Sequence, residues 1–240
     1  MHVYANPARF LKIARPLTAW LGWLGAVLIL VALWFGLFVA PPERFQGDSV
    51  RILYIHVPSA WLAMGGWAGI AAAGLAQLVW RHPLAAVAGR ALGVPGAVFA
   101  ALALATGSLW GRPTWGSYWE WDGRMGSMLV LFFLYLGYIA LAGAERERDG
   151  EGRLTAIFGL VGAINLPIIH YSVVWWKSLH QGQSIDILRG TSAIAPQMLW
   201  PLLGSAIGFT LLFAAIVLMR MRAELARTKV EARMKRMAAE

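Results

Sequence analysis

The chain has 240 residues, of which 59% are hydrophobic and 14% are charged, and its formal net charge is +9. Soluble domains are about half apolar and about a quarter charged, so this composition excludes both an ordinary soluble domain and a disordered chain. The absence of cysteine excludes disulfides, thiolate metal sites and cysteine nucleophiles. In a membrane protein the position of positive charge matters more than its sum, and we expect no nucleic-acid partner.

Six stretches are long and apolar enough to cross a membrane, which takes about 20 mostly apolar residues. They cover residues 17–39, 54–80, 91–109, 125–144, 154–174 and 197–219. We therefore predict an all-α integral membrane protein, a six-transmembrane-helix bundle that forms a single membrane domain over residues 1–219. Residues 220–240 are predicted to be a basic cytoplasmic tail, helical and bound to anionic membrane lipid. A docking site for a cytoplasmic partner is the alternative for this tail.

Lysine and arginine are divided unevenly between the two sides of these spans. Fifteen of them fall on the side of the two termini and the second and fourth loops, and six on the other side. The positive-inside rule therefore places both termini in the cytoplasm. Loops one, three and five then face outward.

Loop three is unusually rich in tryptophan. Four of the thirteen tryptophans of the chain lie in it: Trp110, Trp115, Trp119 and Trp121. An aromatic belt at the membrane surface is one interpretation. The other interpretation is a platform of flat rings on which a large planar ligand would stack. It is considered because an aromatic belt does not require tryptophans in a connection rich in glycine and proline. If the loop is helical, Trp115 and Trp119 share a face.

Two histidines sit inside the outer ends of predicted spans, His56 in the second and His170 in the fifth. Ionisable groups inside spans are costly and usually functional. Two histidines at matched depth, on the same side as the tryptophans, favour joint ligation of a metal. Imidazole is a common axial ligand of haem iron. Pro167 is expected to kink the fifth helix just before His170. His180, in loop five, is interpreted as solvated or as a gate.

Haem also carries two propionates, which need cations. Four outward cations are candidates, although each can also be a plain surface charge: Arg51, Arg112, Arg124 and Lys177. Asp122, at the end of the tryptophan loop, can orient an imidazole or an arginine, or cap the fourth helix. The residues alone do not choose among these roles.

Taken together, these residues resemble those of a known family. The segment from Trp110 to Asp122 resembles the WWD signature of haem-handling proteins. The segments 54–58, 165–172 and 175–182, which surround the three histidines, are similar to those of the C component of the cytochrome c maturation system, haem exporter protein C. The resemblance runs from about residue 10 to residue 220.

This resemblance implies a multi-pass protein of the bacterial inner membrane that holds haem b at its periplasmic face. His56 and His170 would be the axial ligands, and the tryptophan loop would lie against the porphyrin. The haem would pass to a membrane-anchored periplasmic haem chaperone. ABC-type ATPase and permease subunits would release the loaded chaperone, and a small single-span accessory subunit would stabilise the complex. The chain has no P-loop motif, so ATP chemistry would belong to a partner, and we expect no conventional enzyme.

Three residues depart from the pattern of the family. Relatives usually have a larger residue at Gly123, a threonine at Gly126 and often an acidic residue at Val174. Three other functions remain as alternatives. A membrane haem-b electron-transfer protein commonly needs four histidines within spans, a small-solute transporter needs a polar site at the bilayer midplane, and an assembly scaffold would purify colourless.

Overall fold

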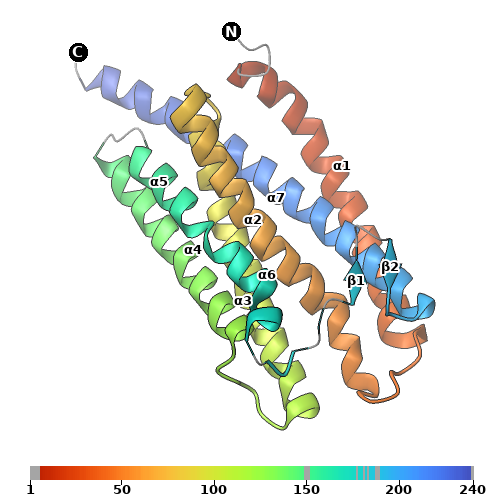
Figure 1. Ribbon diagram of the computed structural model, residues 1–240. Coiled ribbons are helices and arrows are strands. Elements are labelled where there is room, and N and C mark those ends of the chain that lie inside the picture. Colours follow the sequence, from red (N-terminus) through yellow and green to blue (C-terminus); the bar gives the residue numbers. More distant parts are fainter. Residues whose placement is uncertain are drawn as a thin grey trace.

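The fold is built from long helices that run roughly alongside one another (Figure 1). The computed structural model describes residues 6–148, 152–176, 178–180, 182, 184–186 and 190–238. The described α-helices are α1 Pro7–Trp34, α2 Leu53–Trp80, α3 Ala85–Trp115, α4 Gly123–Glu147, α5 Arg153–Gly162, α6 Asn165–Trp175 and α7 Pro196–Met237. A π-helical turn, Phe35–Val39, extends α1, and a 3-10 helix, Asp48–Ile52, leads into α2. The short strands β1 Ile185–Asp186 and β2 Thr191–Ser192 pair antiparallel before α7.

Six segments of the described chain are long and apolar enough to cross a membrane, which confirms the predicted six-helix membrane fold. The fifth of them comprises α5 and α6 together. Several helices are longer than predicted. The third begins at residue 85 instead of 91, and α7 continues past residue 219 without a break to Met237, so the predicted tail helix is confirmed.

A proline breaks the fifth segment into α5 and α6. Pro167 has no N–H to donate to the carbonyl of Ala163, and this carbonyl accepts a hydrogen bond from the N–H of Leu166 at 3.1 Å instead. The kink expected from Pro167 is therefore confirmed, and it interrupts the helix at residues 163–164.

Trp67 of α2 lies fully buried within an apolar cluster. Its indole N–H donates a hydrogen bond to the carbonyl of Gly159 in α5 at 3.1 Å. Its ring meets the edges of Tyr135, Tyr138 and Phe158, with centroid distances of 4.9, 5.9 and 6.2 Å. This cluster joins α2, α4 and α5 by both packing and hydrogen bonding.

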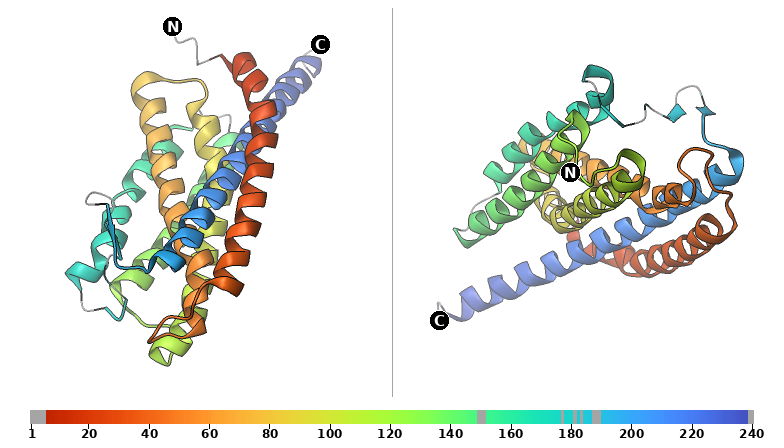
Figure 2. Two further views of the ribbon diagram at one scale, coloured as in Figure 1. Left: turned by 90° about the vertical axis from the view of Figure 1, so that its right-hand side faces the viewer. Right: turned by 90° about the horizontal axis from the view of Figure 1, so that it is seen from below.

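Helices α1 and α7 pack against each other, and Figure 2 shows them together on one side of the other helices. Glycine permits this contact. A Cβ atom on Gly25 would lie 2.9 Å from the carbonyl oxygen of Gly208, and one on Gly208 would lie 3.2 Å from that of Gly25. Small residues allow such close approach between membrane helices.

Two prolines inside helices leave backbone carbonyls without their helical donors, and α7 supplies both replacements. Pro58 of α2 has no N–H to donate to the carbonyl of Tyr54, four residues earlier. The hydroxyl of Ser205 donates a hydrogen bond to that oxygen instead. Pro95 of α3 likewise leaves the carbonyl of Ala91 without its helical donor, and Nε of Arg220 donates a hydrogen bond to this oxygen at 3.1 Å. The long last helix is thus hydrogen-bonded to both α2 and α3.

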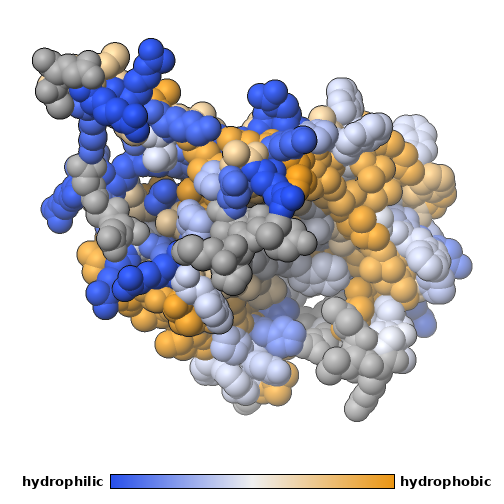
Figure 3. All heavy atoms as spheres, turned by 90° about the horizontal axis from the view of Figure 1, so that it is seen from above, coloured by the Kyte–Doolittle hydropathy of each residue, from blue (hydrophilic) through white to orange (hydrophobic). Residues whose placement is uncertain are grey.

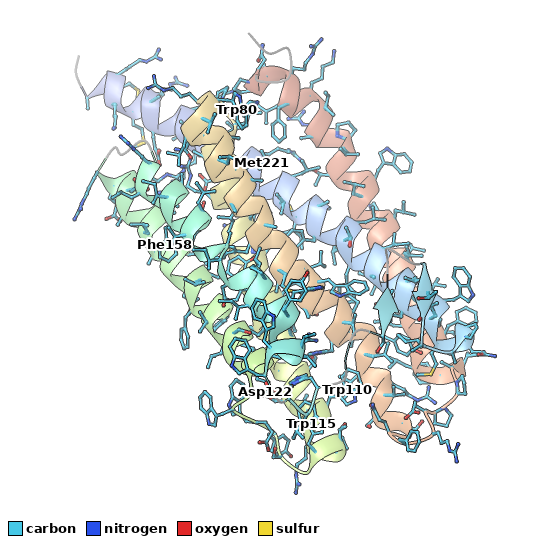
Figure 4. All side chains as sticks on the ribbon, in the orientation of Figure 1. Trp80, Trp110, Trp115, Asp122, Phe158 and Met221 are labelled. Atoms are coloured by element: carbon cyan, nitrogen blue, oxygen red, sulfur yellow. The ribbon has the colours of Figure 1, made fainter. Side chains whose placement is uncertain are left out.

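The bundle has two chemically different ends. Helix α1 begins and α7 ends at the same end (Figure 1), where strongly hydrophilic residues lie beside apolar ones (Figure 3). At this end Glu224 of α7 forms ion pairs with Arg146 of α4 and, at 3.6 Å, with Arg90 of α3. Trp110, Trp115 and Asp122 lie at the opposite end (Figure 4).

Candidate functional site

The tryptophan-rich segment is partly helix and partly loop. Trp110 and Trp115 belong to the last turns of α3, which ends where Gly116 adopts a left-handed conformation with φ of 87°. Trp119 and Trp121 lie in the following loop, and their rings meet at nearly a right angle, 5.3 Å apart. The helical arrangement in which Trp115 and Trp119 would share a face is therefore wrong.

Asp122 ends this loop and performs two of the roles considered for it. Its Oδ1 caps α4 by accepting the N–H of Met125 at 2.8 Å. Its Oδ2 accepts hydrogen bonds from Nδ1 of His180 at 2.6 Å and from the hydroxyl of Ser178 at 2.5 Å. Burial raises the pKa of Asp122, but these hydrogen bonds outweigh it and hold the pKa below its ordinary value. The carboxylate is therefore ionised at neutral pH.

His180 lies within the site, with 17% of its side chain exposed. Its ring meets that of Trp115 edge-on at 4.6 Å. Burial lowers the pKa of His180 more than its bond to Asp122 raises it, so the neutral imidazole predominates at pH 7. A carboxylate can only accept, so Nδ1 carries the hydrogen and Nε2 keeps a lone pair. The interpretation of His180 as a solvated side chain is wrong.

His56 lies in α2 against the last turns of α3. Its Nδ1 is 3.1 Å from the hydroxyl oxygen of Thr106, and its ring meets that of Trp110 at 5.6 Å, nearly perpendicular. His56 is also close enough to His180 and Arg124 to interact with them electrostatically. The structure therefore brings His56 and His180 to one region at the tryptophan-rich end of the bundle.

His170 lies on α6 with its side chain exposed. Its ring is edge-on to that of Tyr171 at 4.8 Å, and its backbone carbonyl accepts a hydrogen bond from Nη2 of Arg124 at 3.4 Å. Its role as an iron ligand stays a prediction.

Two of the candidate arginines are held by groups of this chain. Arg51 pairs with Asp48 at 2.9 Å and donates to two carbonyls within the π-helical turn, those of Gly36 and Leu37. Arg112 donates to the carbonyl of Gly116, and its guanidinium lies over the ring of Tyr118 at 5.8 Å. Lys177 lies outside the described residues.

Arg124 differs from these two. Its Nε atom and the indole Nε1 atom of Trp119 are buried and have no hydrogen-bond partner in the described part of the chain. Buried donors without acceptors are costly and rare in folded proteins. Both donors therefore suit an acceptor that a ligand would bring, such as a carboxylate.

Three features of the site escaped the sequence analysis. Thr106 and Gln46 have no motif of their own, yet Gln46 accepts the indole N–H of Trp110 at 2.8 Å. Gly123 was named in the sequence analysis only as a departure from the family, and the structure shows that it leaves space for a ring. A Cβ atom there would lie 2.9 Å from Trp176, so the glycine lets this tryptophan lie against the start of α4. Only contacts between distant segments reveal these roles.

Comparison with known proteins gives a concordant result. The family model of heme exporter protein C matches residues 1–236 of this chain. The chain belongs to the heme exporter protein C family. Relatives named heme exporter protein C include those of Bradyrhizobium diazoefficiens, 49% identical over 94% of this chain and 85% of the relative, and Escherichia coli strain K12, 46% identical over 92% and 89%. The relative from Haemophilus influenzae is 41% identical over 94% and 91%.

Membership of the heme exporter protein C family confirms the resemblance drawn from the tryptophan segment and the three histidine segments. With its six apolar crossing segments, the chain is a multi-pass protein of the bacterial inner membrane.

Proposed function

We propose that this chain binds haem b at the tryptophan-rich end of the bundle and delivers it to a haem chaperone during maturation of c-type cytochromes. The coarser part of this function, a role in haem export for cytochrome c maturation, is supported by membership of the heme exporter protein C family. The finer part depends mainly on one observation: two imidazoles, each held through Nδ1, lie within electrostatic reach of each other.

The donor set fits haem iron. Iron in haem accepts axial imidazole nitrogens, and both His56 and His180 can offer Nε2. A metal-bound histidine usually donates its other N–H to a carboxylate, a backbone carbonyl or water, and here His180 donates to the carboxylate of Asp122 while Nδ1 of His56 faces the hydroxyl of Thr106. We therefore propose His56 and His180 as the axial pair. His170, the second ligand predicted from the sequence, is the alternative that variants can distinguish.

The surroundings of the histidines also suit a porphyrin. Trp110 lies against His56 and Trp115 against His180, so aromatic surface adjoins both proposed ligands. Arg124 and Trp119 would donate their unpartnered N–H groups to a propionate. Arg51, Arg112 and Arg124 all donate to carbonyls of the chain, but Arg124 also has a buried Nε without a partner in the described part of the chain, so we take it as the leading cation of the site.

The orientation in the membrane follows from the charges. Most lysines and arginines of the chain lie toward the end at which α1 begins and α7 ends, so we place both termini in the cytoplasm and the tryptophan loop in the periplasm. The proposed recipient is a membrane-anchored periplasmic chaperone. ABC-type ATPase and permease subunits and a small single-span subunit complete the proposed complex, and the chain itself acts as a carrier, not a catalyst.

Loading of the chaperone tests this function. Trp119→Ala and Trp121→Ala should each lower the amount of haem-loaded chaperone about 2- to 10-fold, the range expected for one lost aromatic contact. The control is Trp20→Ala, which removes a tryptophan that is 75% exposed on α1. Normal loading in both loop variants would contradict the proposed platform.

A further inference from the structure

The hydroxyl of Thr106 in α3 faces His56, and its one hydrogen already forms a hydrogen bond within α3. Its Oγ1 donates to the backbone carbonyl of Leu102 at 2.6 Å, a hydrogen bond within the helix. A threonine hydroxyl has one hydrogen, so toward Nδ1 of His56, 3.1 Å away, it can only accept. Nδ1 of His56 must therefore carry the hydrogen.

The neighbours of Thr106 restrict His56 to the same arrangement. The carbonyl of Ala103 lies 3.4 Å from the same hydroxyl and is a second acceptor for its one hydrogen. Gly107 provides space for the ring, since a Cβ atom there would lie 3.0 Å from Cε1 of His56. One turn of α3 thus fixes both the place and the tautomer of His56, and leaves the lone pair on Nε2.

The two proposed ligands have unequal support. His180 donates Nδ1–H to an ionised carboxylate, Asp122, at 2.6 Å, whereas His56 donates to a neutral hydroxyl at 3.1 Å. Hydrogen bonds to charged acceptors are shorter and about twice as strong as those between neutral groups. A stronger acceptor on one nitrogen makes the other nitrogen a better metal ligand. His180 should therefore bind iron more tightly than His56.

We propose that Thr106 is a positioning residue that holds His56 as the Nδ1–H tautomer, and that its neutral hydroxyl makes His56 the weaker, exchangeable iron ligand. This inference rests on the proposed function. In the exchange, the bond from iron to Nε2 of His56 breaks and a bond to an incoming imidazole nitrogen forms. No proton or electron is transferred. A site built to release haem needs one ligand that yields before the other.

Displacement by free imidazole tests the inference. The full-length protein, purified in detergent and loaded with haem b, is titrated with imidazole while the visible spectrum reports axial ligation. Thr106→Val keeps the shape of the side chain but removes the acceptor, and should lower the imidazole concentration at half-displacement about 10-fold, the lower end of the effect of losing such a partner. Thr106→Ser keeps the hydroxyl and should stay within about 2-fold of the unmodified protein.

Asp122→Asn is the matched variant on the other ligand, because the single amide oxygen of asparagine cannot both cap α4 and accept Nδ1–H of His180, as the two carboxylate oxygens do. If the ionised carboxylate is what makes His180 the tighter ligand, Asp122→Asn should move the exchange to His180 and lower the imidazole midpoint about 10-fold. An imidazole midpoint that Asp122→Asn leaves unchanged would show that the carboxylate does not strengthen His180, and would overturn the inference.

A double variant separates positioning from structure. Without added imidazole, a His56→Gly protein leaves Thr106 no imidazole to position, so adding Thr106→Val should change nothing in how the protein folds or binds haem through His180. An effect of Thr106→Val that persists without His56 would show a structural role only and overturn the inference.

The proposed function and this inference fail differently. A His56→Gly protein that keeps the unmodified spectrum would remove His56 from the iron and contradict the proposed ligand pair. A spectrum that is lost in His56→Gly, together with a Thr106→Val protein identical to the unmodified one, would leave the function standing and overturn the inference alone.

Discussion

Glu43 organises the short connection between α1 and α2, on which Trp110 depends. Its Oε2 accepts the backbone N–H groups of Phe45 and Gln46, both at 2.8 Å. The side chain of Gln46 in turn accepts the indole N–H of Trp110. A carboxylate in the first loop thereby orders the turn that holds the first tryptophan of the site.

Acidification should loosen this turn. The hydrogen bonds from Gln46 and Phe45 hold the pKa of Glu43 below its ordinary value. A lowered folded-state pKa means that the stabilisation is present above the unfolded-state pKa and is lost as the pH falls through the folded-state value. The hydrogen-exchange protection factors of the Phe45 and Gln46 amides should therefore fall at acid pH. In Glu43→Gln this pH dependence should disappear, and equal pH dependence in both proteins would contradict the account.

At the scale of residues, the sequence predicts some parts of the site and misses others. His56 and the tryptophans are visible because a titratable group in an apolar span and a cluster of rings in a loop are each unusual. The contact of His180 with Asp122 is not visible, since 58 residues separate them and no local period encodes their meeting. The resemblance to the family included the segment of His180, but its physical role needed the fold.

Individual helices owe their packing to single glycines, and two adjacent positions of α2 show how specific this is. A Cβ atom on Gly66 would lie 2.7 Å from the hydroxyl oxygen of Tyr135 and 3.2 Å from the ring of Phe213. A Cβ atom on Gly65 would meet nothing within 4 Å. The two residues share the same helix and neighbourhood but face different surroundings.

Substitution by alanine should therefore act in opposite directions at these positions. Gly66→Ala should lower the free energy of unfolding by about 1–3 kcal/mol, since overpacking forces neighbours to shift. Gly65→Ala should raise it by up to about 1 kcal/mol, because alanine is the better helix former. Unfolding of the purified protein by titration with sodium dodecyl sulfate measures both. Similar destabilisation by the two substitutions would contradict the packing described for α2.

At the scale of elements, apolar runs predict which helices exist but not where they end. The third helix continues to Trp115 and the last to Met237, because a helix extends into polar surroundings as long as its backbone is satisfied. The break before α6 was predictable from Pro167, which removes a donor wherever it lies in a helix.

At the scale of the whole molecule, α7 ties the bundle together. It donates hydrogen bonds to α2 and α3 through Ser205 and Arg220, and Glu224 joins it to α3 and α4 through Arg90 and Arg146. The ion pairs are shielded, with 16% of the Glu224 side chain exposed. The end opposite the proposed site is thus held by an ionic cluster.

Two glutamates of α7 provide a matched test of this cluster. Glu224→Ala leaves two shielded arginines without their partner and should lower the free energy of unfolding by about 1–3 kcal/mol. Glu231→Ala removes an exposed pair with Arg227 in the same helix and should change it by no more than about 0.5 kcal/mol. The same detergent titration compares them. A Glu224→Ala protein as stable as Glu231→Ala would show that the cluster does not hold the bundle.

The visible absorption spectrum of the haem-loaded protein tests the central claim most directly. The unmodified protein is compared with His56→Ala, His180→Ala and His170→Ala, each purified from haem-replete cells. We expect a low-spin spectrum with two imidazole ligands that is lost or altered in the first two variants and kept in the third. A colourless unmodified protein that still loads its chaperone would contradict haem binding. A spectrum altered by His170→Ala but not by His180→Ala would contradict the proposed ligand pair.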